Sequence, residues 1–368
     1  MKKLSKILSL VLALVMCLAL VSCGGGSSSG GATSDAATSG AASGSSDSSS
    51  ASGGQSGATA ATGAQDGCNV DLSGVDLSGK TLGYVTITST APWGGRVGTE
   101  FERMAKEAGA TVKTLDANTN ADDVITFCRQ MIDAGVDGLA VFGGDPTGMV
   151  DIAKECSEAG IPLFLCGLDV AEEGREYATA CIGPDQEQAF VDIAKKVIED
   201  NGTTDELNVV QISGVPFLMD YQLREAGFSS GMSEASNYNL YEPDYAFSSR
   251  TDAKSFMEQH IQADGDKINI VMGYDDDLTM GAVDAINEAG MTGSIKVYSF
   301  TGQNDAIQAV KDGKMELTVM NRADDIAAET CVAMNEYFST GSTEYYHYTD
   351  LIYITADNVD QYLGKGEF

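Results

Sequence analysis

Short apolar runs alternate with segments of helical period from Lys80 onward, and this alternation limits the fold more than any other feature of the chain. The runs are continuous rather than interleaved with polar residues, which is typical of strands covered on both faces of a parallel sheet. Repeated strand–helix units predict right-handed crossovers and an open sheet with helices on both faces. The expected strands are 81–87, 111–115, 138–142, 162–166, 207–212, 268–272, 295–300 and 317–320.

The segment between the second and third expected strands shows the helical period. Val124, Cys128 and Met131 recur at i, i+4 and i+7, which places them on one helix face. Asn120 has the side chain of an N-cap, and Gly135 can adopt the left-handed conformation that ends a helix. We therefore expect an amphipathic helix between these two residues.

A weak internal repeat divides the strand–helix array. Residues 138–166 run strand, Gly/Asp-rich turn, helix ending in Glu-Ala-Gly, then strand, and residues 269–300 follow the same order. The repeat predicts two Rossmann-like, doubly wound α/β lobes. Ligands of such sheets bind beyond the carboxyl ends of the strands, so two facing lobes predict one ligand cleft between them.

The first residues have the layout of a secretory signal. Lys2, Lys3 and Lys6 precede an apolar run, 7–21, that is too short to span a bilayer. The sequence Leu-Val-Ser-Cys that ends at Cys23 resembles a bacterial lipobox, in which the cysteine is lipidated and becomes the new N-terminus. We expect a signal peptide at 1–22 and a lipid anchor on Cys23 outside the cytoplasm; an ordinary cleaved signal with a chance cysteine is the alternative.

A low-complexity segment follows Cys23. Of the 44 residues in 24–67, 39 are Gly, Ser, Ala or Thr, which leaves too little apolar surface to offset the entropy of an unfolded chain. We expect residues 23–79 to form a disordered linker, with folded structure beginning at Lys80.

Charge and cysteine usage exclude several classes of function. The chain has 54 acidic and 22 basic residues, a net charge of −32, which disfavours binding to nucleic acid. No Cys-x-x-Cys pair occurs and the only histidines are His260 and His347, so neither a zinc site nor a cofactor is expected. Cys166 and Cys181 end neighbouring expected strands, and a disulfide between them is left open.

Three catalytic patterns match in letters but fail in context. Residues 74–81 spell a phosphate-binding loop, yet a strand follows where a helix is required. Residues 227–231 spell a nucleophile elbow but continue an expected helix, and 275–277 lack the offsets of a calcium loop. We expect a binding receptor rather than an enzyme; a surface-anchored hydrolase that uses Ser229 and His347 is the alternative from another class.

Several short motifs follow one another along the chain: Ala91-Pro92-Trp93, 134–139, 158–163, Gly227-Phe228, Asp276 with 280–282, and 310–314. In this order and spacing they resemble the ribose-binding-like branch of the bacterial solute-binding proteins, the receptors of sugar ABC transporters. The resemblance implies a type 1 periplasmic binding fold, with two lobes that are joined by three crossing strands and close on a ligand by hinge bending. We expect lobes at 80–185 plus 322–345 and at 186–321 plus 346–363, in a monomer.

The resemblance also implies a set of ligand-binding residues. Aromatic side chains would stack on the apolar face of a sugar, and polar side chains would bond its hydroxyl groups. Gln222 and Gly167-Leu168 stand where many members carry arginine, so two arginine positions are expected to be lost. The implied ligand residues are Trp93, Phe247 and Phe300 for stacking, with Asp169, Gln222, Asp275 and Asn321 for hydrogen bonding.

These residues suit a small neutral sugar or polyol, because buried carboxylates without partners cost several kcal/mol. The resemblance implies delivery of this solute to the transmembrane subunits of an ABC permease. A cationic solute is the second choice, since Asp169 and Asp275 would lack an arginine. A nucleoside-like solute bound in the same way is also left open.

Overall fold

The computed structural model describes residues 68–90, 92–202, 206–216, 218–246 and 249–366. The expected signal peptide at 1–22, the lipidation residue Cys23 and the stacking residue Phe247 lie outside the described residues, and they remain predictions. Among the helices that the structure describes, none is long and apolar enough to cross a membrane.

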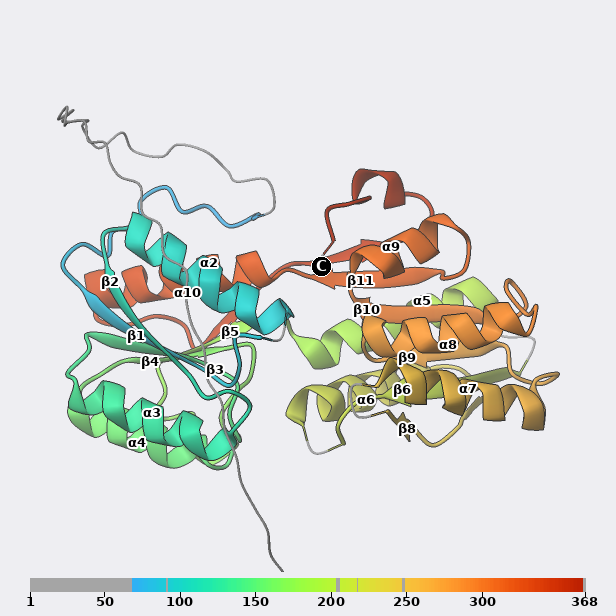
Figure 1. Cartoon of the computed structure of the whole chain (residues 1–368), viewed down its shortest axis with the longest axis horizontal. Coiled ribbons are helices and arrows are strands. Elements are labelled where there is room, and N and C mark those ends of the chain that lie inside the picture. The colour runs from blue at the N-terminus through green and yellow to red at the C-terminus, as the bar shows by residue number, and fades with distance from the viewer. Residues whose placement is uncertain (1–67, 91, 203–205, 217, 247–248, 367–368) are drawn as a thin grey trace, which may run out of the picture. The chain divides into compact units, whose positions relative to one another are not determined.

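The first lobe is built on a six-stranded parallel sheet with strand order β12-β5-β4-β3-β1-β2 (Figure 1). Helices α2 and α10 cover one face of this sheet, and α3 and α4 cover the other. The strands are β1 Thr81–Thr86, β2 Thr111–Asp116, β3 Gly138–Phe142, β4 Leu163–Cys166, β5 Ala180–Gly183 and β12 Tyr346–Tyr348. The helices are α2 Pro92–Glu107, α3 Ala121–Asp133, α4 Met149–Ala159, the short 3₁₀ helix η2 Glu172–Gly174 and α10 Ala323–Thr340.

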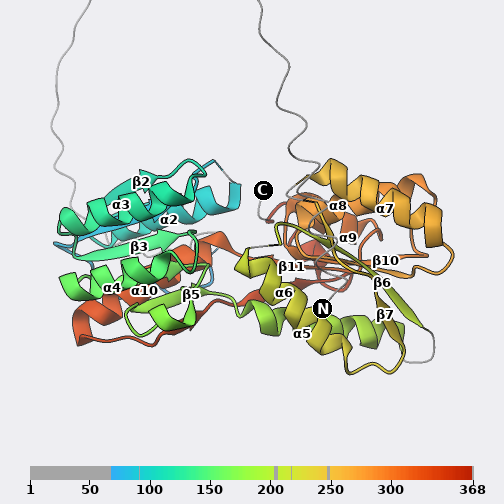
Figure 2. The same cartoon turned by 90° about the horizontal axis from the view of Figure 1, so that it is seen from below.

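The second lobe is built on a sheet of order β13-β11-β10-β9-β6-β7, with β8 also paired to β6 and only β13 antiparallel. Figure 2 shows α7 and α8 on one face of this sheet and α5 and α6 on the other. The strands are β6 Leu207–Ser213, β7 Tyr238–Leu240, β8 Asp244–Tyr245, β9 Ile270–Gly273, β10 Lys296–Thr301, β11 Leu317–Asn321 and β13 Leu351–Ile354. The helices are α5 Gln186–Asn201, α6 Met219–Met232, α7 Arg250–Asp264, α8 Asp276–Glu288, α9 Asn304–Lys311 and the 3₁₀ helix η3 Val359–Gln361.

The two sheet-and-helix lobes confirm the predicted α/β class. Each of the eight expected apolar runs forms a strand, with bounds that differ by at most two residues. The expected helix after Asn120 is α3: the Asn120 side chain accepts a hydrogen bond from the Asp122 N–H, and Val124, Cys128 and Met131 are buried. Gly135 follows the helix with φ +62°, a conformation that favours glycine.

The lead-in segment, residues 68–79, is not the disordered linker that we expected. Leu77 is fully buried in the core under α2, and Val70, Leu72 and Val75 pack against the same core. The Leu77 N–H also donates to the Ala108 carbonyl at 2.8 Å. Composition alone missed this segment because its four apolar side chains are spaced among turn residues, and only their burial reveals them.

The chain passes between the two lobes three times. The first passage leads from β5 to α5, the second from β11 to α10, and the third from β12 to β13. The third passage corrects the expected boundary at Tyr346, because Tyr346–Tyr348 pairs with β5 and therefore belongs to the first lobe. The Thr349 N–H donates to the Gly183 carbonyl at 3.1 Å and joins the third passage to the first.

The six described cysteines are all free thiols. In the register of β4 and β5, Cys181 lies opposite Leu165 and Cys166 lies opposite Ile182. Cys166 contacts the Thr330 hydroxyl instead, at 3.4 Å. The disulfide between Cys166 and Cys181 that the sequence left open is therefore not formed in this structure.

The rejected catalytic patterns take ordinary structural roles. The phosphate-loop letters lie in turns before β1, and the Lys80 ammonium stands 4.5 Å from the centre of the Phe338 ring. The elbow letters fall inside α6, where Gly227 lets the helix approach the Glu187 carbonyl so closely that a Cβ would stand 2.2 Å away. Both ring nitrogens of His347 are engaged, by Glu329 and Thr343.

Candidate functional site

Trp93 lies in the first turn of α2, beyond the carboxyl end of β1. Its ring lies 5.7 Å from the Phe142 ring at the end of β3, and its indole N–H donates to the Asn321 carbonyl at 2.8 Å. Trp93 is half-buried, so part of the ring stays accessible. Gly167 lies beside the same ring with φ +84°, and a Cβ there would contact both Phe142 and Trp93.

Asp169 follows β4 in the first lobe and is held by three partners. Its carboxylate accepts hydrogen bonds from the Tyr345 hydroxyl at 2.6 Å and the Tyr346 hydroxyl at 3.0 Å. Arg175 completes the set, with its Nε 2.8 Å from the same carboxylate. The expected unpaired carboxylate therefore has an arginine partner, supplied from six residues further along the chain.

Arg224 is a candidate ligand residue of the second lobe that sequence reasoning did not include. It lies on α6, is buried, and donates to the Gln186 side chain at 2.6 Å and to the Tyr274 carbonyl at 2.9 Å. Its guanidinium lies 4.8 Å from the centre of the Phe300 ring. Asp220, one helical turn earlier, is 3.8 Å away. The sequence does contain a pattern that could have identified Arg224. Asp220 and Arg224 are an acid and an arginine at i and i+4, which places both side chains on one helix face.

Two expected ligand residues of the second lobe, Gln222 and Phe300, do not lie together in the structure. Gln222 is exposed and donates to the Pro216 carbonyl. Phe300 is fully buried in the second core against Phe190, with centroids 5.1 Å apart, so its ring supports Arg224 rather than an open surface. The helix does carry a buried arginine, Arg224, two residues beyond Gln222.

Burial and Arg224 act in opposite directions on two carboxyl groups. Burial raises the pKa of Asp275, and the positive charge of Arg224 opposes that rise. Burial likewise raises the pKa of Asp220, which Arg224 and the hydrogen bond from Gln186 oppose. A carboxylate with a neighbouring guanidinium does not demand a cationic ligand. The observation that motivated a cationic solute, two carboxylates without an arginine, is therefore absent.

Asp276 lies just beyond the carboxyl end of β9 in the second sheet. The carboxyl group is fully buried at the start of α8, accepts from the Gln303 N–H at 2.8 Å, and lies 2.8 Å from the Thr318 hydroxyl. Burial raises its pKa to about 7, against the hydrogen bonds that favour the ion. Thr301, which the Asp276 N–H contacts, has φ +120°, a strained value for a residue other than glycine.

Asn321 ends β11 with its side-chain oxygen buried and without a hydrogen-bond partner. The residue is 4% exposed, and its backbone carbonyl accepts from Trp93. A buried amide oxygen without a partner costs about 1–3 kcal/mol, which a ligand hydroxyl can recover. Trp93 and Asn321 are thus two expected ligand residues that the structure brings together.

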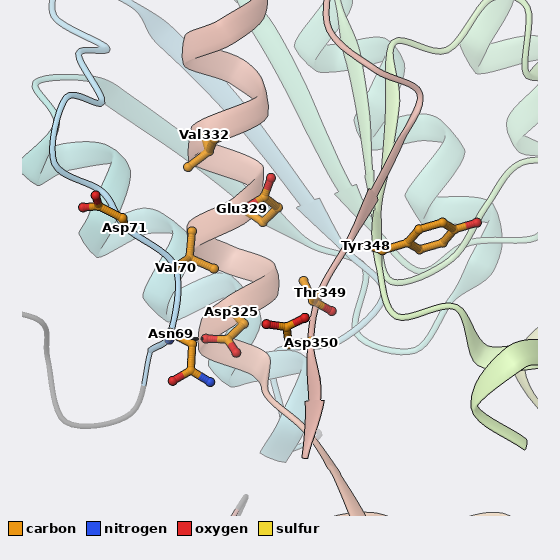
Figure 3. A pocket seen from close by; sticks show the side chains of 9 residues that line it. All are labelled: Asn69, Val70, Asp71, Asp325, Glu329, Val332, Tyr348, Thr349 and Asp350. Atoms are coloured by element: carbon orange, nitrogen blue, oxygen red, sulfur yellow. Dashed lines mark hydrogen bonds between the residues drawn. The ribbon is translucent and has the colours of Figure 1, made fainter. Parts of the chain in front are cut away.

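Two cavities of about 290 Å³ lie on the first lobe, and neither is lined by any of the expected ligand residues. One lies beside α10 and the third passage (Figure 3). The other lies at the amino ends of β4 and β5, next to Ile161 and Tyr177. The expected ligand residues that the structure describes lie at or beyond the carboxyl ends of strands and outside both cavities.

The described part of the chain contains no group of three or more His, Cys, Asp or Glu that could hold a metal ion. Comparison with known proteins then decides the family. Residues 82–342 match the family model described as periplasmic binding protein domain, which is more than half of the chain. The chain belongs to the periplasmic binding protein family.

Curated relatives of this periplasmic binding protein include two proteins that are named for the sugars they bind. The galactofuranose-binding protein of Escherichia coli K12 is 27% identical over 247 residues, which covers 65% of this chain and 76% of the relative. The ribose import binding protein of Bacillus subtilis 168 is 26% identical over 243 residues, covering 65% and 75%. Both are named as binding proteins, in agreement with the expectation that the chain is not an enzyme.

Solved structures share the fold of this periplasmic binding protein. The crystal structure of a galactofuranose-binding protein superposes with a TM-score of 0.70 at 24% identity, covering 78% of this chain and 98% of that one. A solute-binding protein from Actinobacillus succinogenes with bound D-allose superposes with a TM-score of 0.68 at 20% identity, covering 77% and 100%. At these identities the likeness shows the fold alone.

Proposed function

We propose that this chain is the extracytoplasmic solute receptor of an ABC importer and binds a small neutral sugar or polyol between its two lobes. The main support for a neutral ligand is that carboxylates are paired with arginines: Asp169 with Arg175, and Asp220 with Arg224. Such pairs present donors and acceptors together, which suits hydroxyl groups that both donate and accept. The names of the galactofuranose and ribose relatives support the sugar class.

The proposed contacts divide between the lobes. Trp93 supplies an apolar ring for the C–H face of the sugar, and the free oxygen of Asn321 accepts a hydroxyl proton. Arg224, Asp220 and Asp275 supply the hydrogen bonds of the second lobe. Bending at the three passages would close one set on the other, so the solute is held and released without a bond being made or broken.

The proposed setting follows from the N-terminal sequence and the family. Cys23 would carry the lipid that anchors the receptor as a monomer to the outer face of the membrane. The linker 24–67 would let it reach the transmembrane subunits of its permease. Mass spectrometry of the cell-derived protein tests the anchor: a diacylglyceryl-modified N-terminal Cys23 supports it, and an unmodified N-terminus after a different cleavage site contradicts it.

A thermal-shift screen with pentoses, hexoses, polyols and nucleosides tests the ligand class. A ligand at about 100 times its Kd adds roughly 2.7 kcal/mol, which raises the melting temperature by a few degrees. Trp93→Ala should abolish this shift because the stacking ring is lost, whereas Trp93→Phe should retain most of it.

The two Trp93 variants also separate binding from stability. Both lose the N–H donated to Asn321, so a lower melting temperature without ligand in both variants reports that bond and not the solute. If no sugar or polyol shifts the wild type, or if a solute shifts Trp93→Ala as much as the wild type, the proposed site is wrong. Turnover of any screened compound by the purified protein would contradict a receptor.

A further inference from the structure

The cavity beside α10 is formed by three segments that are far apart in the sequence (Figure 3). The lead-in segment, α10, and the third passage between the lobes each contribute to it. Four of the nine lining residues are acidic and none is basic. The lining residues are Asn69, Val70, Asp71, Asp325, Glu329, Val332, Tyr348, Thr349 and Asp350.

Two residues that line this cavity each carry a buried side-chain oxygen without a hydrogen-bond partner. Asp325 is 1% exposed; its Oδ1 accepts from the Asn69 N–H at 2.8 Å, but its Oδ2 has no partner. Thr349 is 8% exposed, and its hydroxyl oxygen is likewise unpartnered. Most buried polar atoms in folded proteins are paired, so two such atoms in one cavity indicate a missing hydrogen-bonding group.

The charge of the lining favours a cation. Asp71 bonds Ser73, and the Glu329 carboxylate bonds the His347 ring at 2.8 Å, which leaves Asp325 and exposed Asp350 to face the cavity. Burial raises the pKa of Asp325, and the hydrogen bond from the Asn69 N–H and the nearby charge of Arg322 oppose this rise. A bound cation would act in the same direction as Arg322 and stabilise the ionised carboxylate.

Shape distinguishes the kind of cation. The described residues hold no group of three or more acidic, His or Cys side chains placed for a metal ion, and this applies to the cavity as well. The volume of about 290 Å³ also exceeds what one ion needs, because a water molecule occupies about 30 Å³. An ammonium group has three N–H donors, and it can bond Asp325, Thr349 and Asp350 while its carbon chain covers Val70 and Val332.

We propose that this cavity is a binding site for a small primary amine, whose ammonium group joins Asp325 to Thr349 and Asp350. The site is separate from the proposed sugar site and does not depend on it. Asp325 follows the second passage between the lobes, and Thr349 lies in the third, so a bound amine ties these two passages together.

Titration calorimetry of the full chain with propylamine tests the site, with propanol as an uncharged ligand of similar size and calcium chloride as a metal comparator. We expect saturable binding of one propylamine at millimolar concentration and none of propanol. Asp325→Asn and Asp350→Asn should each weaken propylamine roughly tenfold or more, because a charged partner is removed. Asp350 is exposed, so its variant folds even if Asp325→Asn does not.

Two controls locate the bound amine. Asp133→Asn removes the same charge from the exposed end of α3 and should bind as the wild type does. Trp93→Ala should also retain amine binding, which distinguishes this cavity from the sugar site. Binding should slow hydrogen exchange at the Thr349 amide, which bonds Gly183 across the passages.

The proposal fails if propylamine does not bind, if propanol binds equally, or if Asp133→Asn weakens binding as much as Asp325→Asn. Calcium binding that Asp325→Asn abolishes, without propylamine binding, would replace the amine with a metal and overturn the proposal. Amine binding that Trp93→Ala abolishes would place the amine at the sugar site instead.

Discussion

At the scale of single residues, Arg224 shows how the contacts around a buried charge stabilise it. Arg224 lies over the rings of Phe300 and Tyr221 and has hydrogen-bond acceptors at Gln186 and Tyr274. The guanidinium can be buried because its planar faces contact rings while its edges donate. A charged group fixed this firmly loses little entropy when it binds a ligand, which is the property a solute receptor needs.

Asp276 gives a pH prediction at the same scale. Its pKa is about 7 in the folded chain and near the ordinary aspartate value when unfolded, so the folded chain holds a proton that the unfolded chain has released. The stability from this group is present below the ordinary value and is lost as pH rises through about 7. Asp276→Asn should therefore reduce the fall in unfolding free energy between about pH 5 and about pH 8 by on the order of 2 kcal/mol.

Urea denaturation at the two pH values measures this difference. Asn keeps an acceptor for the Gln303 N–H and a donor for the Thr318 oxygen, so it imitates the protonated acid. Asp151→Asn, on the exposed face of α4, is the control and should leave the pH dependence unchanged. An unchanged pH dependence in Asp276→Asn would mean that Asp276 is ionised throughout this range.

At the scale of elements, most strands and the amphipathic helices were predictable, and the short strands β7, β8 and β12 were not. Continuous apolar runs such as 138–142 mark strands buried on both faces, and the cap at Asn120 marks the start of α3. The short edge strands β7, β8 and β12 expose at least part of their side chains, so they carry no such run. The lead-in segment was hidden for the same reason, since only Leu77 among its residues is fully buried.

Leu77 gives a prediction for the lead-in segment. Leu77→Ala removes a side chain that is fully buried with Val97 and Phe101, and it should lower the free energy of unfolding by about 2–5 kcal/mol. Val75→Ala, at a half-buried position of the same segment, should cost less than about half as much. Urea midpoints measure both changes. Equal and negligible effects would show that the segment does not stabilise the first lobe.

At the scale of the whole molecule, the division into two lobes was predictable, and the contacts within the candidate site were only partly so. A repeat of strand, turn and helix reveals two lobes because it reflects local patterning. Trp93 and Asn321 were assigned from the family resemblance, and they meet through a hydrogen bond. Arg175 and Arg224 were not assigned from the resemblance. Arg175 reaches Asp169 across a loop, and Arg224 reaches Asp220 across one helix turn. Matching single positions to a family motif does not reveal such contacts.

The net charge of −32 gives a prediction at this scale. Acids exceed bases by more than two to one, so mutual repulsion should outweigh the exposed ion pairs that salt weakens. Raising sodium chloride from low concentration to about 0.15 M, where the screening length is about 8 Å, should raise the melting temperature by a few degrees. Potassium chloride should act equally, and an uncharged solute of equal osmolarity should do less. A lower melting temperature in salt would show that the ion pairs dominate.

The late position of α10 and β12 sets the order in which the molecule can be completed. α10 fills the core under α2, and β12 adds the last strand to a sheet whose other five strands end at Gly183. A nascent chain that has left the ribosome only as far as β11 has its second lobe nearly whole, while the apolar side of α2 is still bare. The lobe that starts first in the sequence is therefore completed only when almost the entire polypeptide has been made. Until then it exposes apolar surface that chaperones can bind.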